Sequence, residues 1–228
     1  MNNPLSIPDA AQVLELSPSR VRAMAVHGQL AASKIGDRWL VERSAVETRR
    51  RKGGHSGRPF APHSAWVLLL LASGQTVEGI DPSVRSRLRR AVRVDGLAKL
   101  APRLVRRAES QHFDVHPGEL RYLLEDPAFL QTGISAAGEY GLDLLSGHEA
   151  DGYVAASGLK QLIADHALSA ADPGSGNVRV RLVPDKAWRH LADAKIAPTA
   201  AVAIDLAEDP DPRSASAGKQ MLRRLNRR

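Results

Sequence analysis

The sequence of 228 residues contains no cysteine. This excludes disulfides, thiolate nucleophiles and every zinc or iron–sulfur site with cysteine ligands, and it fits a reducing cytosol. The longest apolar run, residues 65–72, is far shorter than the ~18 residues of a membrane span. The first residues, Met1-Asn2-Asn3-Pro4, carry neither the basic end nor the apolar centre of a secretion signal. We therefore expect a cytoplasmic protein.

The usual enzyme signatures are also absent. No glycine-rich loop precedes a lysine, and Gly133-Ile134-Ser135-Ala136-Ala137 lacks the Gly-x-Ser-x-Gly spacing of a nucleophile elbow. His112, Asp114 and His116 alternate, and a strand would place them on one face as metal ligands. Because Pro117 follows at once, Asp114 or His116 is more simply the start of a helix. We expect no enzyme, no cofactor and no metal, with a metal-dependent enzyme kept as an alternative.

Positive charge is concentrated in the first half of the chain. Residues 1–110 hold 19 Lys and Arg against nine Asp and Glu, whereas residues 111–218 hold eight against 16. Lys219, Arg223, Arg224, Arg227 and Arg228 then crowd the last ten residues. This asymmetry predicts a region that binds a polyanion and a separate module with another role.

The first fifty residues predict two short helices and a hairpin. Ser6 and Ser17 are each followed by a proline near the first helical turn, which predicts helices that begin near both positions. Gly28 ends the second helix, and residues 33–41 predict a hairpin with Gly36-Asp37 at its tip and with Trp39 and Val41 facing the helices. A short helix over 43–48 closes the unit. Two helices joined by a brief turn form a helix-turn-helix.

This order of elements resembles the excisionase and MerR-type winged helix-turn-helix family over about residues 5–50. The likeness rests on Ser17-Pro18-Ser19-Arg20-Val21, Gly28-Gln29-Leu30 and Gly36-Asp37-Arg38-Trp39. A helix N-terminus fits the major groove, where an arginine reads guanine through two hydrogen bonds, and wing residues reach phosphates or the minor groove. Met24, Ala25 and Val26 leave few polar side chains for base contacts, so we expect dimeric or cooperative binding.

Two further basic stretches follow. Residues 49–60 mix arginines with three glycines and a proline, which predicts a flexible linker able to lie in a minor groove. Residues 85–107 carry nine basic residues and one acid. Within this stretch the spacing predicts a helix from Leu97 to Ala108, with Leu97, Leu100, Leu104 and Ala108 inward. DNA or an acidic protein partner remain open for this stretch. The residues expected to contact DNA are Ser17, Ser19, Arg20, Arg22, Lys34, Arg38, Arg49, Arg50, Arg51, Arg103 and Arg107.

The remainder predicts a mixed module with a small sheet. We expect helices at 117–125, 135–145, 157–164, 186–193, 199–207 and 214–225, and strands at 152–156 and 177–183. The fold class is therefore α+β and mainly helical. The predicted domains are a winged helix-turn-helix at 1–48, a linker at 49–60, a basic helical segment at 61–110 and an α+β interaction domain at 111–228.

Residues 60–225 resemble the AbiEi-type antitoxin domain. The likeness rests on residues 133–142, on Val180-Arg181-Leu182-Val183-Pro184, and on Ala197-Pro198, Ala203-Ile204-Asp205-Leu206 and Asp211-Pro212-Arg213. The resemblance implies a DNA-binding autorepressor of a toxin–antitoxin operon, which binds inverted repeats and counters a nucleotidyltransferase toxin. The excisionase-like N-terminal domain departs from the usual type in that family. The alternative is an excisionase-like or architectural DNA-binding factor without a toxin.

Overall fold

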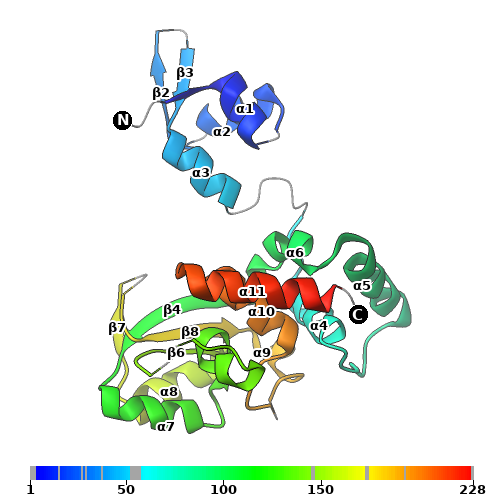
Figure 1. Ribbon diagram of the computed structural model, residues 1–228, viewed down its shortest axis with the longest axis vertical. Helices are drawn as coiled ribbons and strands as arrows, with labels where there is room; N and C mark the ends of the chain where they lie inside the picture. The colour runs from blue at the N-terminus through cyan, green and yellow to red at the C-terminus, as the bar shows by residue number, and fades with distance from the viewer. Residues whose placement is uncertain are drawn as a thin grey trace. The chain divides into compact units, whose positions relative to one another are not determined.

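A computed structural model describes residues 4–14, 16–26, 28, 30–36, 38–51, 58–144, 147–172, 175–192 and 194–226. The chain divides into two compact units, Met1–Arg58 and Pro59–Arg228. The architecture is α+β and mainly helical with two small sheets, as predicted (Figure 1).

The N-terminal unit contains the predicted helices and hairpin. Its elements are β1 (Leu5–Ser6), α1 (Ile7–Leu14), α2 (Pro18–Val26), β2 (Ala32–Ile35), β3 (Arg38–Val41) and α3 (Arg43–Arg51). The three strands form an antiparallel sheet in the order β1-β3-β2. Gly28 has a φ of +67°, the left-handed conformation expected after the end of α2. Asp37, at the predicted tip, lies outside the described residues.

A small apolar core holds this unit together. Its fully buried members include Ala10 of α1, Val21 of α2, Val41 of β3 and Val46 of α3. Val41 faces the helices as predicted, whereas Trp39 on the same strand face is half-buried. Each element of the unit therefore contributes one apolar side to a common interior.

The last helix of this unit is longer than expected. It continues through Arg51, so residues 49–51, which were assigned to the linker, are helical. Residues 52–57 of the predicted linker lie outside the described residues.

The C-terminal unit begins with helices and continues as a mixed sheet with covering helices. Its α-helices are α4 (Pro62–Ala72), α5 (Pro82–Asp95), α6 (Leu97–Leu100), α7 (Leu120–Glu125), α8 (Leu159–Asp165), α9 (Asp185–Trp188), α10 (Thr199–Ala207) and α11 (Pro212–Leu225). Its 3-10 helices are η1 (Ala101–Arg103), η2 (Val105–Arg107), η3 (Pro117–Glu119), η4 (Gly133–Tyr140) and η5 (Ala156–Gly158). Its strands are β4 (Glu109–Asp114), β5 (Leu130–Gln131), β6 (Ala150–Ala155), β7 (Ser169–Ala171) and β8 (Val178–Val183).

The five strands form one sheet in the order β5-β6-β8-β4-β7. The central pair β6 and β8 is parallel, and the other pairs are antiparallel. The two strands predicted at 152–156 and 177–183 therefore correspond to the parallel pair β6 and β8. The shorter strands β5 and β7, and β4 with its mixed sequence, were not predicted.

Helices cover both faces of this sheet (Figure 1). One face packs on α4, α9, α10 and α11 through a core that includes Trp66, Tyr153 and Ile204. The other face packs on α7 and α8 through a second core that includes Phe129 and Val154. Tyr153 and Val154 are neighbours on β6, and they enter opposite cores because side chains alternate along a strand.

The predicted boundary at residue 110 does not separate two units. Leu68 and Leu69 of α4 share one core with Ile204 of α10, so residues 61–110 belong to the same unit as the sheet. The predicted helix from Leu97 to Ala108 is also wrong, because α6 ends at Leu100 and two 3-10 turns follow. Pro102 lacks the backbone N–H that a continuous α-helix would need there.

Candidate nucleic-acid interface

Helix α2 presents its polar side to solvent. Ser17 precedes the helix, and its Oγ accepts a hydrogen bond from the backbone N–H of Arg20 at 3.4 Å. Val21, Met24 and Ala25 are buried, whereas Ser19, Arg20 and Arg22 are exposed. The Oγ atoms of Ser17 and Ser19 lie 3.1 Å apart. The first turns of α2 therefore offer hydroxyls, guanidinium groups and backbone amides together.

The hairpin forms the wing beside α2. Lys34 pairs with Trp39 and Ile35 with Arg38 in the antiparallel register, so both cations lie next to the tip. The side chains of Lys34, Ile35 and Arg38 are all exposed, and Ile35 is 64% exposed. Exposed cations at the tip of a wing have the chemistry that contacts phosphates.

A surface groove joins α2 to the wing. It has a volume of about 670 Å³ and is lined by Ser6, Ile7, Pro8, Pro18, Ser19, Arg22, Arg38, Trp39 and Leu40. The groove thus brings Ser19 and Arg22 of α2 together with Arg38 of β3. Arg20 and Lys34 are exposed but do not line it. Two guanidinium groups and a hydroxyl around one hollow are suited to hydrogen bonds with phosphates and base edges.

The three arginines expected at the start of the linker belong to α3. Arg49 is half-buried, and its Nε is buried with no hydrogen-bond partner among the described residues. Arg50 and Arg51 are helical, and their side chains lie outside the described part of the chain. The helical backbone replaces the flexible arm that the sequence indicated here.

The assignment of Arg107 to DNA is wrong. Only 4% of this residue is exposed, and its Nη2 donates to Asp205 Oδ1 at 2.7 Å and to Glu208 Oε2 at 2.5 Å. Its Nε donates to the hydroxyl of Tyr153 at 3.2 Å. Burial disfavours the charged guanidinium, but Tyr153, Asp205 and Glu208 outweigh burial and raise the pKa of Arg107. A buried and paired cation is not accessible to a phosphate.

Arg103 occupies a more open position. It is half-buried, and its guanidinium lies over the ring of Phe60, 4.2 Å from the ring centre. The backbone N–H of Phe60 also donates to the carbonyl of Arg103 at 2.9 Å. Arg103 therefore links Phe60 to η1, the turn that follows α6.

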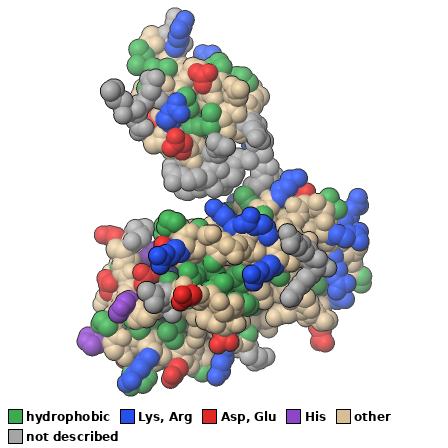
Figure 2. Space-filling model, viewed as in Figure 1, with side chains coloured by type: hydrophobic (Ala, Val, Ile, Leu, Met, Phe, Trp, Pro, Cys, Tyr) green, Lys and Arg blue, Asp and Glu red, His purple; other side chains and the backbone are tan. Residues whose placement is uncertain are grey.

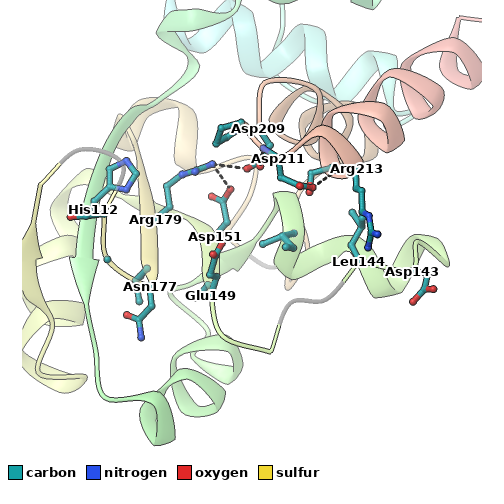
Figure 3. Close-up of a pocket in the computed structure, with 17 residues that line it drawn as sticks. His112, Asp143, Leu144, Glu149, Asp151, Asn177, Arg179, Asp209, Asp211 and Arg213 are labelled. Carbon is teal, nitrogen blue, oxygen red and sulfur yellow. Dashed lines mark hydrogen bonds and ion pairs between the residues drawn. The ribbon is translucent and has the colours of Figure 1, made fainter.

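The three candidate metal ligands, His112, Asp114 and His116, have different structural surroundings. His112 lines a cavity of about 460 Å³ (Figure 3), whereas Asp114 is exposed and ends β4. His116 directly precedes η3, and its Nδ1 caps this turn by accepting a hydrogen bond from the N–H of Gly118, which matches the expected helix start. Within the described residues no group of three or more His, Cys, Asp or Glu side chains is placed to hold a metal ion.

Three charged groups of that cavity form ion pairs with one another. Arg179 of β8 lies between Asp151 of β6 and Asp209, with its Nη1 3.4 Å and 3.1 Å from a carboxylate oxygen of each (Figure 3). Asp211 accepts a hydrogen bond from the N–H of Ser214 and thereby caps α11. These hydrogen bonds lower the pKa of Asp211. These four side chains of the cavity therefore form contacts that stabilise the fold.

The comparisons with known proteins concern the N-terminal unit. Residues 4–53 match the family model described as a helix-turn-helix domain. No curated protein and no solved structure matches the chain. Within the described residues, no helix has both the length and the apolar character needed to cross a bilayer. The match covers α1, α2, the wing and α3, so the N-terminal unit is a helix-turn-helix domain of the DNA-binding type.

Proposed function

We propose that the protein is a DNA-binding transcriptional regulator that represses its own operon and serves as the antitoxin of a nucleotidyltransferase toxin. The observation that carries the DNA-binding part is the groove that joins Ser19 and Arg22 of α2 to Arg38 of the wing. In this proposal α2 enters the major groove and the wing lies along the adjacent backbone.

The contacts divide into two classes by position. Ser19, Arg20 and Arg22 project from the first turns of α2, where arginine reads guanine through O6 and N7. Lys34 and Arg38 lie beside the wing tip and contact phosphates. The buried face of α2, with Val21, Met24 and Ala25, faces its own core. One unit therefore offers few base contacts, which supports binding as a dimer or cooperatively at inverted repeats.

Binding to duplex DNA is tested with single substitutions in the full chain. Arg22→Ala and Arg38→Ala remove the two guanidinium groups of the groove, and each should weaken binding to the DNA upstream of the operon about tenfold or more. Arg43→Ala is the matched control, because Arg43 is an exposed arginine of the same unit outside the groove. Equal affinities for all three variants and the wild type would contradict the proposed interface.

The antitoxin part rests on the resemblance of residues 60–225 and on the separation of the chain into two units. The excess of acidic residues in 111–218 supports a role other than DNA contact for this part of the C-terminal unit. The test is co-expression with the product of the adjacent gene. Restored growth with the full chain and with Pro59–Arg228 alone would support the proposal, and continued toxicity with both would contradict it.

An excisionase-like or architectural DNA-binding factor is the second candidate. The small winged unit with its short α2 favours this second candidate, since a small DNA-binding unit can bend DNA without a toxin partner. An integrase gene beside this one and DNA bending without repression would support this alternative. A nucleotidyltransferase gene in the same position would favour the antitoxin.

A further inference from the structure

Helix α5 carries a row of four arginines, of which three are exposed and one is half-buried. The row consists of Arg85, Arg89, Arg90 and Arg93, here named the arginine stripe. With Pro82 and Ser86 these residues line a shallow groove of about 520 Å³. Figure 2 shows Lys and Arg side chains gathered at the edge of the C-terminal unit, where Figure 1 places α5.

The packing of α5 against the core determines which of its residues face solvent. Leu88 is buried, and Val84, Ala91 and Val92 pack against the same core. At 3.6 residues per turn, positions 89, 90 and 93 fall on the side away from this apolar face, whereas the half-buried Arg85 lies at its flank. Asp81 caps the first turn by accepting hydrogen bonds from the N–H groups of Ser83 and Val84. Cap and core together hold the arginines on one rigid element.

The charges of the stripe are not neutralised by the unit itself. Within the described residues, no carboxylate forms an ion pair with any member of the stripe, and Asp95 at the end of α5 pairs with Lys99 instead. Arg85 is oriented by a hydrogen bond from its Nη2 to the carbonyl of Val77 at 3.0 Å. Arg89, Arg90 and Arg93 are exposed. Several positive charges are thus held close together, and an anionic ligand would relieve the repulsion between them.

The residues that line the groove favour DNA over an acidic protein as the partner. Protein interfaces have an apolar or aromatic centre from which charged residues are depleted, and this groove has only Pro82 as an apolar member. Arginine and serine are residue types that contact phosphate and sugar in protein–DNA complexes. From Arg85 to Arg93 the stripe extends about 12 Å along the helix axis, and one DNA strand places a phosphate every ~3.4 Å of duplex.

We propose that the arginine stripe is a second surface for duplex DNA, which binds the phosphate backbone without reading its sequence. This inference rests on the proposed function, since it adds a contact to the same DNA. A second weak surface on one chain raises affinity because the first contact increases the effective concentration of the other. The stripe would add contacts to phosphates, and the helix-turn-helix domain would recognise the base sequence.

The experiment compares two double variants of the full chain that remove equal charge. Arg89→Gln with Arg93→Gln removes two charges of the stripe, and Lys160→Gln with Lys186→Gln removes two exposed charges of α8 and α9. Fluorescence anisotropy measures binding to a labelled 30-base-pair duplex of mixed sequence between low and near-physiological salt. Circular dichroism checks that each variant remains folded.

We expect the stripe variant to bind about 10- to 100-fold more weakly at ~0.1 M salt, with a salt slope smaller by about 1.8. The lysine control should keep the slope of the wild type. Equal slopes and affinities for the two variants would overturn the second surface and leave the proposed function intact. Failure of the wild type to bind any duplex would instead overturn the proposed function, and the inference with it.

Discussion

Replacement of Asp205 by asparagine should destabilise the C-terminal unit severely. Asp205 lies on α10 and is fully buried, and its carboxylate accepts hydrogen bonds from Thr132 at 2.6 Å and Tyr153 at 2.7 Å. It also pairs with Arg107 at 2.7 Å and with Arg181 at 3.2 Å. Burial favours the neutral acid, but the two arginines outweigh burial and lower the pKa of Asp205. The carboxylate is therefore charged in the folded unit.

The magnitude follows from what Asp205→Asn leaves behind. The amide side chain carries no charge, so among the described residues Arg107 would keep the partly exposed Glu208 as its one carboxylate partner, and Arg181 would keep Asp151. Removal of one partner from a buried ion pair costs about 3–5 kcal/mol, because the remaining charge is left uncompensated. Since domains are stable by only about 5–15 kcal/mol, the variant should lose a large share of its stability.

Urea denaturation followed by tryptophan fluorescence measures this effect in the full chain. Trp66 lies edge-on to Tyr153 with ring centres 4.8 Å apart, so its emission reports on the core beside Asp205. Asp143→Asn is the matched control, because Asp143 is an exposed carboxylate of the same unit. Equal transition midpoints for the two variants would refute the reasoning and show that the buried ion network contributes little.

Two further predictions concern the C-terminal unit. Gly152→Ala should destabilise it by about 1–3 kcal/mol in the same urea assay, because a Cβ there would lie 2.3 Å from the buried ring of Phe129, whereas Gly147→Ala meets nothing within 4 Å and should have little effect. Burial opposes protonation of His166, but hydrogen bonds with Asp126 and Glu119 outweigh it and raise the pKa of His166. The stability from these pairs is fully present below a pH of ~6.5 and is lost as pH rises through the raised pKa, so His166→Gln should flatten the fall in urea midpoint above that pH. An unchanged pH profile in the variant would remove His166 as its cause.

The N-terminal unit could be predicted from sequence because its signals are local. Ser17 and Pro18 mark the start of one helix, Gly28 marks its end, and each signal lies within a few residues of the feature it determines. The wing followed from strand alternation around Gly36. The extension of α3 through Arg51 was missed because its arginines suit a helix as well as a basic arm.

The C-terminal unit was harder because its determinants are distant in sequence. Arg107 looked like an exposed cation on a basic helix, but its partner Asp205 lies 98 residues later. Local periodicity carries no information about such a pair. The strands β6 and β8 were predicted, β8 from its clear alternation, whereas β4 is paired on both sides by strands that lie far along the chain. Tertiary pairing therefore decided what local preference left open.

A footprint titration on the duplex upstream of the operon tests the central claim most directly. Wild type and Arg22→Ala are compared at low and near-physiological salt, since protection that rests on base contacts persists when counterion release is weakened. We predict that the wild type protects a defined inverted repeat at both salt concentrations, and that Arg22→Ala loses this protection. Diffuse protection that disappears with salt and is the same in both proteins would contradict sequence-specific recognition by α2.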